Sequence, residues 1–238
     1  MRGRWSDYAA PPVYLTREPP RSGVRFSREE LRQLAVAILA LSAAMTLLIV
    51  LGYQREGLLD PDALPLLVSV SFATSLVAVA TGVGLHEIAH KVVAQRYGHW
   101  AEFRYNPMGL VLAFVFAAVG FLYGAPGATW ISGTVTDEQN GRISAAGPLT
   151  NIVLGVGFLG ILTTLGTVVT RPGLGDLARA IVNFATFVNL VLAGFNMIPV
   201  MPLDGAKVWA WNKVAYVGIL VTVVGLFILG FVSGVLRV

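Results

Sequence analysis

Long stretches of sequence without a single charged residue are the feature that most limits how this chain can fold. Six of them exceed the roughly 20 residues that a helix needs to cross a bilayer. They cover 33–54, 63–85, 105–136, 143–170, 180–203 and 214–236. Only 13% of the 238 residues are charged, about half the share found in soluble domains, so polar side chains are too few to cover a soluble globule. The sequence therefore predicts an all-α polytopic membrane protein.

The chain divides into a short polar tail and one membrane-embedded domain. Residues 1–32 hold seven arginines and four of the twelve prolines, which predicts a disordered basic tail. Ser27 and Glu30 mark the start of the first helix. Residues 33–238 are expected to form a single domain in the lipid bilayer.

Basic residues next to membrane spans are retained on the cytosolic side, so the tail is predicted to be cytosolic in a multi-pass protein of the cell membrane. The same rule explains the net charge of +4, and no nucleic-acid partner is expected.

Two of the three histidines mark a candidate metal site. They lie in the sequence His86-Glu87-Ile88-Ala89-His90 at the end of the second apolar stretch. On a helix, positions i and i+4 share one face, which suits two ligands of a single ion. Glu87 can then act as a general base without being a ligand. The alternative is a chance pattern in which both histidines hydrogen-bond their neighbours. Because the chain has no cysteine, cysteine-ligated zinc, iron–sulfur clusters and a cysteine nucleophile are excluded.

A third ligand is needed, and Asp204 is the clear candidate because few acids lie near the apolar stretches. Pro199 and Pro202 should stop the preceding helix, and Gly205 permits a tight turn after the aspartate. Such irregular backbone at membrane depth is tolerated where it lines a cavity or is buried in protein. The alternative is that Asp204 caps a helix or closes a turn in an ordinary interfacial loop.

Three motifs together resemble a known family. HEIAH at 86–90 is followed by Gly147-Pro148-Leu149-Thr150-Asn151, which has the pattern GPxxN, and then by NxxPxxPLDG at 196–205. In this order they resemble the site-2 protease family of intramembrane zinc metalloproteases. The resemblance implies one zinc ion per chain and gives six residues a role: ligands His86, His90 and Asp204, catalytic base Glu87, and substrate-lining residues Asn151 and Asn196.

The ligand set restricts the topology. Zinc–ligand bonds are about 2 Å long, so Asp204 must lie at the membrane depth of the two histidines. The chain must then cross the membrane an odd number of times between Lys91 and Arg179, although two apolar stretches lie there. We expect 105–136 to be the one that does not cross.

Several features of 105–136 support this choice. It contains Pro107 and Pro126 together with Gly120, Gly124 and Gly127, and it ends in strand-like residues 128–135. It is expected to form a re-entrant or β-hairpin-like segment between the second and third spans, with an edge that can pair with an extended substrate. The result is five transmembrane helices, a C-terminus opposite the N-terminus, and thirteen of the seventeen lysines and arginines on the cytosolic side.

Other polar residues are predicted to be structural. His99 and Trp100 are expected to be interfacial belt residues near a span end, and a third zinc ligand is the alternative for His99. Asn183 and Asn189 lie inside 180–203 and are expected to hydrogen-bond neighbouring helices.

The functional hypothesis is hydrolysis of peptide bonds within or beside the transmembrane segments of single-span membrane proteins, as in regulated intramembrane proteolysis. Zinc would polarise the scissile carbonyl, and Glu87 would move the proton. Two alternatives stay open, a metal-ion transporter built on the same ligands and a catalytically silent membrane scaffold. A transit site needs no adjacent glutamate and the chain has no internal repeat, whereas a silent relative would be free to lose Glu87.

Overall fold

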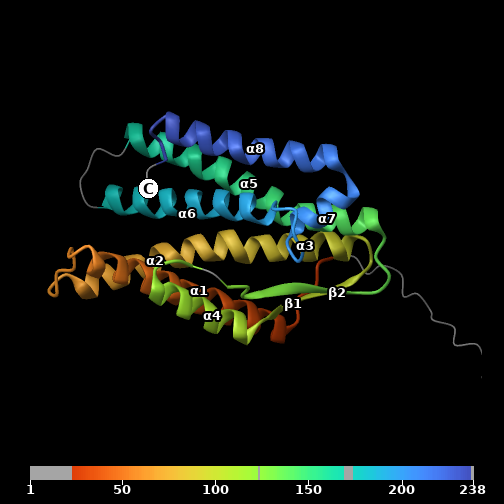
Figure 1. The fold of residues 1–238 in the computed structure, drawn as a ribbon, viewed down its shortest axis with the longest axis horizontal. Coiled ribbons are helices and arrows are strands. Elements are labelled where there is room, and N and C mark those ends of the chain that lie inside the picture. The colour runs from red at the N-terminus through yellow and green to blue at the C-terminus, as the bar shows by residue number, and fades with distance from the viewer. Residues whose placement is uncertain (1–22, 123, 169–173, 237–238) are drawn as a thin grey trace, which may run out of the picture.

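The computed structural model describes residues 23–122, 124–168 and 174–236, and most of them lie in long helices aligned along one direction (Figure 1). In chain order the elements are α1 (Arg28–Arg55), α2 (Leu64–Val79), the π-helical segment η2 (Ala80–Gly84), α3 (Leu85–Arg96), β1 (Trp100–Tyr105), α4 (Pro107–Val119), β2 (Gly127–Ser132), α5 (Asp137–Val168), α6 (Leu174–Asn196), α7 (Asp204–Trp211) and α8 (Lys213–Val232).

Five helices of the described part are long and apolar enough to cross a membrane, which confirms the predicted all-α polytopic fold. They are α1, the continuous helix α2–η2–α3 over Leu64–Arg96, α5, α6 and α8. α4 has only 13 residues, too few for a span. The chain is thus a multi-pass membrane protein.

The first helix begins where the sequence indicated. The Ser27 side chain accepts a hydrogen bond from the Glu30 backbone N–H at 3.1 Å, and Glu29 and Glu30 occupy the first turn. The positive end of the helix dipole stabilises acidic residues at these positions. Residues 28–32 of the predicted tail are therefore helical, while 1–22 lie outside the described residues.

Helices α2 and α3 lie between α1 and α4 on one side and α5, α6 and α8 on the other (Figure 1). Small residues are frequent in the largest buried cluster, which includes Ala44, Ala78, Ala113, Ala117 and Ala185. Membrane helices pack closely where such residues meet, because lipid offers no hydrophobic drive for association.

The segment at 105–136 does not cross, as predicted, but its structure is richer than a hairpin. β1 and β2 pair antiparallel with Phe103 opposite Thr129, and α4 lies between them in the chain. Asn106 caps α4 by accepting the N–H groups of Met108 and Gly109, and α4 ends at Val119, where Gly120 with a φ of 110° forms the C-cap.

One sequence-based expectation needs correction here. The span predicted at 180–203 is too long, because α6 ends at Asn196 and a run of turns leads to α7. Pro199 and Pro202 lie in those turns, where a continuing helix would have lost backbone hydrogen bonds.

Candidate metal centre

The two histidines lie on α3, directly after the π-helical segment η2. Such segments interrupt an α-helix for one turn and occur frequently at functional sites. Gly82 of η2 permits close packing, because a Cβ there would lie 2.8 Å from a Leu192 side-chain carbon of α6. Both imidazoles turn toward α5 and α7 and are buried, with 5% of His86 and 7% of His90 exposed.

Asp204 completes a three-residue cluster. Its Oδ2 lies 3.2 Å from His86 Nε2 and 3.1 Å from His90 Nε2, and the ligand atoms all lie within 4.8 Å of one another. Three ligands at tetrahedral angles and about 2 Å from zinc would be about 3.3 Å apart. The structure thus brings His86, His90 and Asp204 together as the sequence analysis expected of a metal site. The two segments that carry these ligands, α3 and α7, lie toward the same end of the bundle (Figure 1).

The hydrogen bonds on the far side of each imidazole explain why this cluster suits a cation. His86 Nδ1 lies 2.5 Å from Asn151 Oδ1, and His90 Nδ1 lies 2.7 Å from the Ile143 carbonyl oxygen. Both partners are acceptors, so each neutral imidazole carries its proton on Nδ1. The two Nε2 lone pairs and a carboxylate oxygen then face one another in a buried space, an arrangement that a positive ion stabilises.

Room for the ion comes from Gly147 on α5. A Cβ at this position would lie 2.5 Å from the Nε2 atoms of both histidines. Any side chain would therefore occupy the space that the ligand atoms surround. The donor set and this space both fit a metal ion.

Asp204 is positioned by the start of α7. It is the first residue of that helix, where the helix dipole favours an anion. A Cβ at Gly205 would collide with the Met197 backbone, so the glycine lets α7 begin close to the end of α6. Oδ2 of Asp204 faces the Nε2 atoms of both histidines, and a carboxylate that binds a metal does so in its ionised form.

Glu87 lies beside the cluster and is held by strand β2. Its Oε2 accepts hydrogen bonds from the Thr129 backbone N–H and hydroxyl, each at 2.9 Å, and the hydroxyl also lies 3.0 Å from the Glu87 carbonyl oxygen. Glu87 is thus not one of the three grouped ligands, and its role as the base stays a prediction.

Similarity to known proteins decides the family. A protein of Methanocaldococcus jannaschii named "Putative zinc metalloprotease MJ0611" is 36% identical over 209 residues, which make up 87% of this chain and 94% of that protein. The chain belongs to the site-2 protease family of zinc metalloproteases. The metal of the cluster is accordingly zinc, which binds imidazole and carboxylate ligands.

Two further relatives match over part of their length. "Zinc metalloprotease MJ0392" of the same organism is 25% identical over 140 residues, which are 59% of this chain and 34% of that protein. "Putative zinc metalloprotease Rip3" of Mycobacterium tuberculosis is 32% identical over 131 residues, which are 54% of this chain and 28% of that protein. The chain thus matches about a third of each of these longer relatives. No family model matches the chain, and no solved structure matches it.

The two asparagines predicted to line the substrate site lie in different surroundings. Asn151 is fully buried, and its amide group bonds His86, Gly82 and Asn189. This set of contacts orients His86, and the predicted role of Asn151 toward substrate stays a prediction. Asn196, the last residue of α6, is half-buried and donates to the Leu192 carbonyl at 3.0 Å. Its role toward substrate stays a prediction.

Sequence reasoning missed three contributors to the site. Gly147 is the glycine of the GPxxN motif, so the motif could have indicated that the backbone lies close to the histidines at this position. Thr129 is 42 residues from Glu87, and the Ile143 carbonyl is a backbone atom. Neither carries a sequence signal that links it to the histidines.

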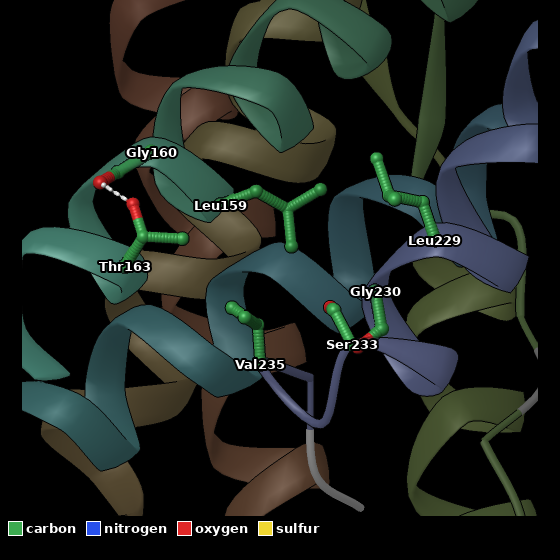
Figure 2. A pocket seen from close by; sticks show the side chains of 7 residues that line it. All are labelled: Leu159, Gly160, Thr163, Leu229, Gly230, Ser233 and Val235. Carbon is green, nitrogen blue, oxygen red and sulfur yellow. Dashed lines mark hydrogen bonds between the residues drawn. The ribbon is translucent and has the colours of Figure 1, made fainter.

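An apolar pocket elsewhere in the bundle is separate from the metal centre. Figure 2 shows its seven lining residues on α5, α8 and the segment after α8: Leu159, Gly160, Thr163, Leu229, Gly230, Ser233 and Val235. None of them is ionisable, and the Thr163 hydroxyl donates to the Gly160 carbonyl. α8 starts just after α7, and 17 residues of helix between Lys213 and Gly230 span about 26 Å. The pocket therefore lies toward the opposite end of the bundle.

Proposed function

We propose that this metalloprotease hydrolyses peptide bonds within or beside the transmembrane segments of single-span, membrane-anchored proteins. The observation that carries the proposal is the position of the ligand set. Three buried ligands come from α3, the end of a membrane-spanning helix, and from α7, which joins two others. A site built into the helix bundle meets substrates that are themselves in the membrane.

The chain supplies the acid–base chemistry. When bound, zinc acts as the Lewis acid that polarises the scissile carbonyl and makes water easier to deprotonate. Glu87 takes the proton from the attacking water and delivers it to the leaving amide nitrogen. The Thr129 N–H and hydroxyl both lie 2.9 Å from Oε2 of Glu87, so Oε1 is the oxygen proposed to receive the proton.

The small sheet offers a place for an extended substrate. The outer edge of β1 is already covered by α1, because Glu30 and Gln33 accept the N–H groups of Phe103 and Tyr105, each at 3.1 Å. The outer edge of β2 lies next to α3 and Glu87. An unwound substrate segment that adds to β2 would therefore run past the base.

Substrate unwinding follows from the same geometry. In a helix each carbonyl is held by its own hydrogen-bond ladder, so the scissile bond is reached only where that ladder opens. Helix-breaking residues in the substrate should therefore favour cleavage. Residues with high helix propensity near the scissile bond should slow cleavage.

The proposed location is the cell membrane with the N-terminus in the cytosol. α1 starts at the end of the bundle that holds α3 and α7 (Figure 1). The metal centre would then lie near the cytosolic face, where a released protein segment enters the cytosol.

The test compares wild type, Glu87→Gln and the matched control Glu56→Gln in liposomes with a panel of single-span substrates. Zinc content is measured in each preparation. We expect wild type and Glu56→Gln to cleave, and Glu87→Gln to retain one zinc ion without cleaving. Cleavage by Glu87→Gln at the wild-type rate would reject Glu87 as the base. A protein that binds zinc, cleaves none of the panel and moves zinc into sealed vesicles would instead be a transporter.

A further inference from the structure

Asn189 lies in the middle of α6 and is fully buried, yet it contacts no metal ligand. A chain of hydrogen bonds nevertheless connects it to His86. Asn189 Oδ1 accepts from Asn151 Nδ2 at 2.9 Å, and Asn151 Oδ1 lies 2.5 Å from His86 Nδ1. Each buried amide is costly to hold away from water unless its hydrogen bonds are made.

The remaining amide hydrogens of this chain are also bonded. Asn151 Nδ2 donates to the Gly82 carbonyl of η2 at 2.8 Å. Asn189 Nδ2 donates to the Ala185 carbonyl at 2.8 Å and to the Thr81 hydroxyl at 3.1 Å. The network therefore joins η2, α5 and α6 around His86.

Two backbone carbonyls fix the direction of every bond in the network. A carbonyl oxygen can only accept, so Ala185 requires the NH₂ group of Asn189 and turns its oxygen toward Asn151. Gly82 requires the NH₂ group of Asn151 in the same way and turns its oxygen toward His86. The amide orientations are thus determined by the bonds rather than assigned by choice.

The direction decides which nitrogen of His86 carries the proton. With an oxygen at Nδ1, the neutral imidazole is protonated there and presents an unprotonated Nε2 to the cluster. If the Asn151 amide turned over, its NH₂ group would face Nδ1 and favour the form protonated on Nε2. That form cannot bind a metal through Nε2.

We propose that Asn189 is a positioning residue of the metal centre, which holds the Asn151 amide in the orientation that turns the free Nε2 of His86 toward the ion. This inference rests on the zinc site of the proposed function and extends it to a residue outside the three motifs. Asn189 acts through Asn151 and touches neither substrate nor ion.

The test measures zinc affinity of the full-length protein in detergent, by competition with a chromophoric chelator. Asn189→Leu keeps the volume of the side chain and removes the amide, and Asn189→Ala is a second variant that adds no bulk. We expect both to bind zinc about tenfold more weakly, the lower end of losses seen when partners of metal-bound histidines are removed.

Thr186→Val is the matched control. Thr186 is also fully buried on α6, but its hydroxyl bonds only the Val182 carbonyl of its own helix at 2.7 Å. The zinc affinity of the Thr186→Val protein should equal that of wild type. Equal weakening in this control would assign the effect to loosening of α6 and overturn the proposal, as would wild-type affinity in both Asn189→Leu and Asn189→Ala.

A spectroscopic readout separates positioning from general destabilisation. Nitrogen NMR with labelled histidine reports which ring nitrogen is protonated, and the zinc-free measurement uses Asp204→Ala protein, because the carboxylate 3.2 Å from His86 Nε2 would otherwise accept a proton from that nitrogen. His86 should show the Nδ1–H form in this background and a mixture when Asn189→Ala is added. An unchanged tautomer in that variant would also overturn the proposal. Neither measurement requires cleavage, so a failed substrate panel would leave this inference intact, and a failed tautomer test would leave the protease intact.

Discussion

Thr129 contacts Glu87 through two donors, its backbone N–H, which lies 2.9 Å from Oε2, and its hydroxyl, which lies 2.9 Å from Oε2 and 3.0 Å from the Glu87 carbonyl oxygen. The strand proposed to offer an edge to substrate therefore also holds the proposed base. Because the Thr129 N–H is donated to Glu87, a substrate strand would pair with the rest of this edge and not with that N–H.

Replacement of Thr129 by valine should slow the chemical step. The change keeps the shape of the side chain but removes the hydroxyl that orients Glu87. General bases contribute about 10²–10⁴-fold to rate, and partial loss of orientation should lower kcat about tenfold, with KM and zinc content unchanged. Steady-state kinetics would show this, and Thr129→Ser should restore most of the rate. A wild-type kcat for Thr129→Val would contradict the role.

Alanine at position 147 should abolish zinc binding without unfolding the protein. Its Cβ would lie 2.5 Å from Nε2 of both histidines, within the space of the ion. Elemental analysis of purified protein measures the loss. Gly157→Ala is the control on the same helix, since a Cβ at Gly157 meets nothing within 4 Å, and it should keep one zinc ion. Full zinc occupancy in Gly147→Ala would refute this geometry.

The buried ion pair between Glu30 and Lys91 should be important for stability. Each residue is 1% exposed, and Glu30 also accepts the Phe103 backbone N–H. Glu30→Ala leaves the lysine charge buried and unpaired, which should lower the free energy of unfolding by about 3 kcal/mol. Thermal unfolding in detergent measures the effect, and Glu29→Ala, an exposed neighbour, should leave Tm nearly unchanged. Equal Tm values for the two variants would show that the pair contributes nothing.

Topology can be tested with single cysteines because the chain has none. Asp60 lies between α1 and α2, and Glu138 lies at the start of α5, so they mark opposite ends of the bundle. On intact cells an impermeant maleimide should label Asp60→Cys, and it should label Glu138→Cys only after permeabilisation. The reverse pattern would place the N-terminus and the metal centre outside.

Removal of zinc should stop cleavage and leave the helices in place. The largest buried cluster is formed by α1, α2, α4 and α6 and includes none of the ligands. A chelator should therefore abolish activity while far-UV circular dichroism stays unchanged, and added zinc should restore the rate. Tm should fall, because an ion that binds only the folded state stabilises it. Loss of helical signal on chelation would mean that the metal holds the fold itself.

The spans and the ligand set were accessible from the sequence for simple physical reasons. Charge-free length predicts a crossing, and the short zinc–ligand bond forces Asp204 to the depth of the histidines. This depth argument led to the non-crossing segment at 105–136, which composition alone would have counted as a span. The HEIAH spacing needed only helical periodicity.

What escaped prediction depends on contacts between distant residues. β1 contains Glu102 and Arg104, so it resembles a polar loop, and it becomes a strand because β2 pairs with one edge and α1 side chains bond the other. The interhelical hydrogen bonds expected of Asn189 are present, but their direction toward His86 requires the positions of two backbone carbonyls. No local pattern encodes such positions.

The ligand set is divided between two distant parts of the chain, since Asp204 follows His90 by 114 positions. A ribosome adds about 5–20 residues per second, so the interval between them is on the order of 10 s. Throughout that time the nascent protein carries Glu87 in the membrane with an incomplete ligand set. The nascent chain therefore has no complete metal site during its own synthesis. It cannot cleave other proteins at the insertion machinery until α7 has been made.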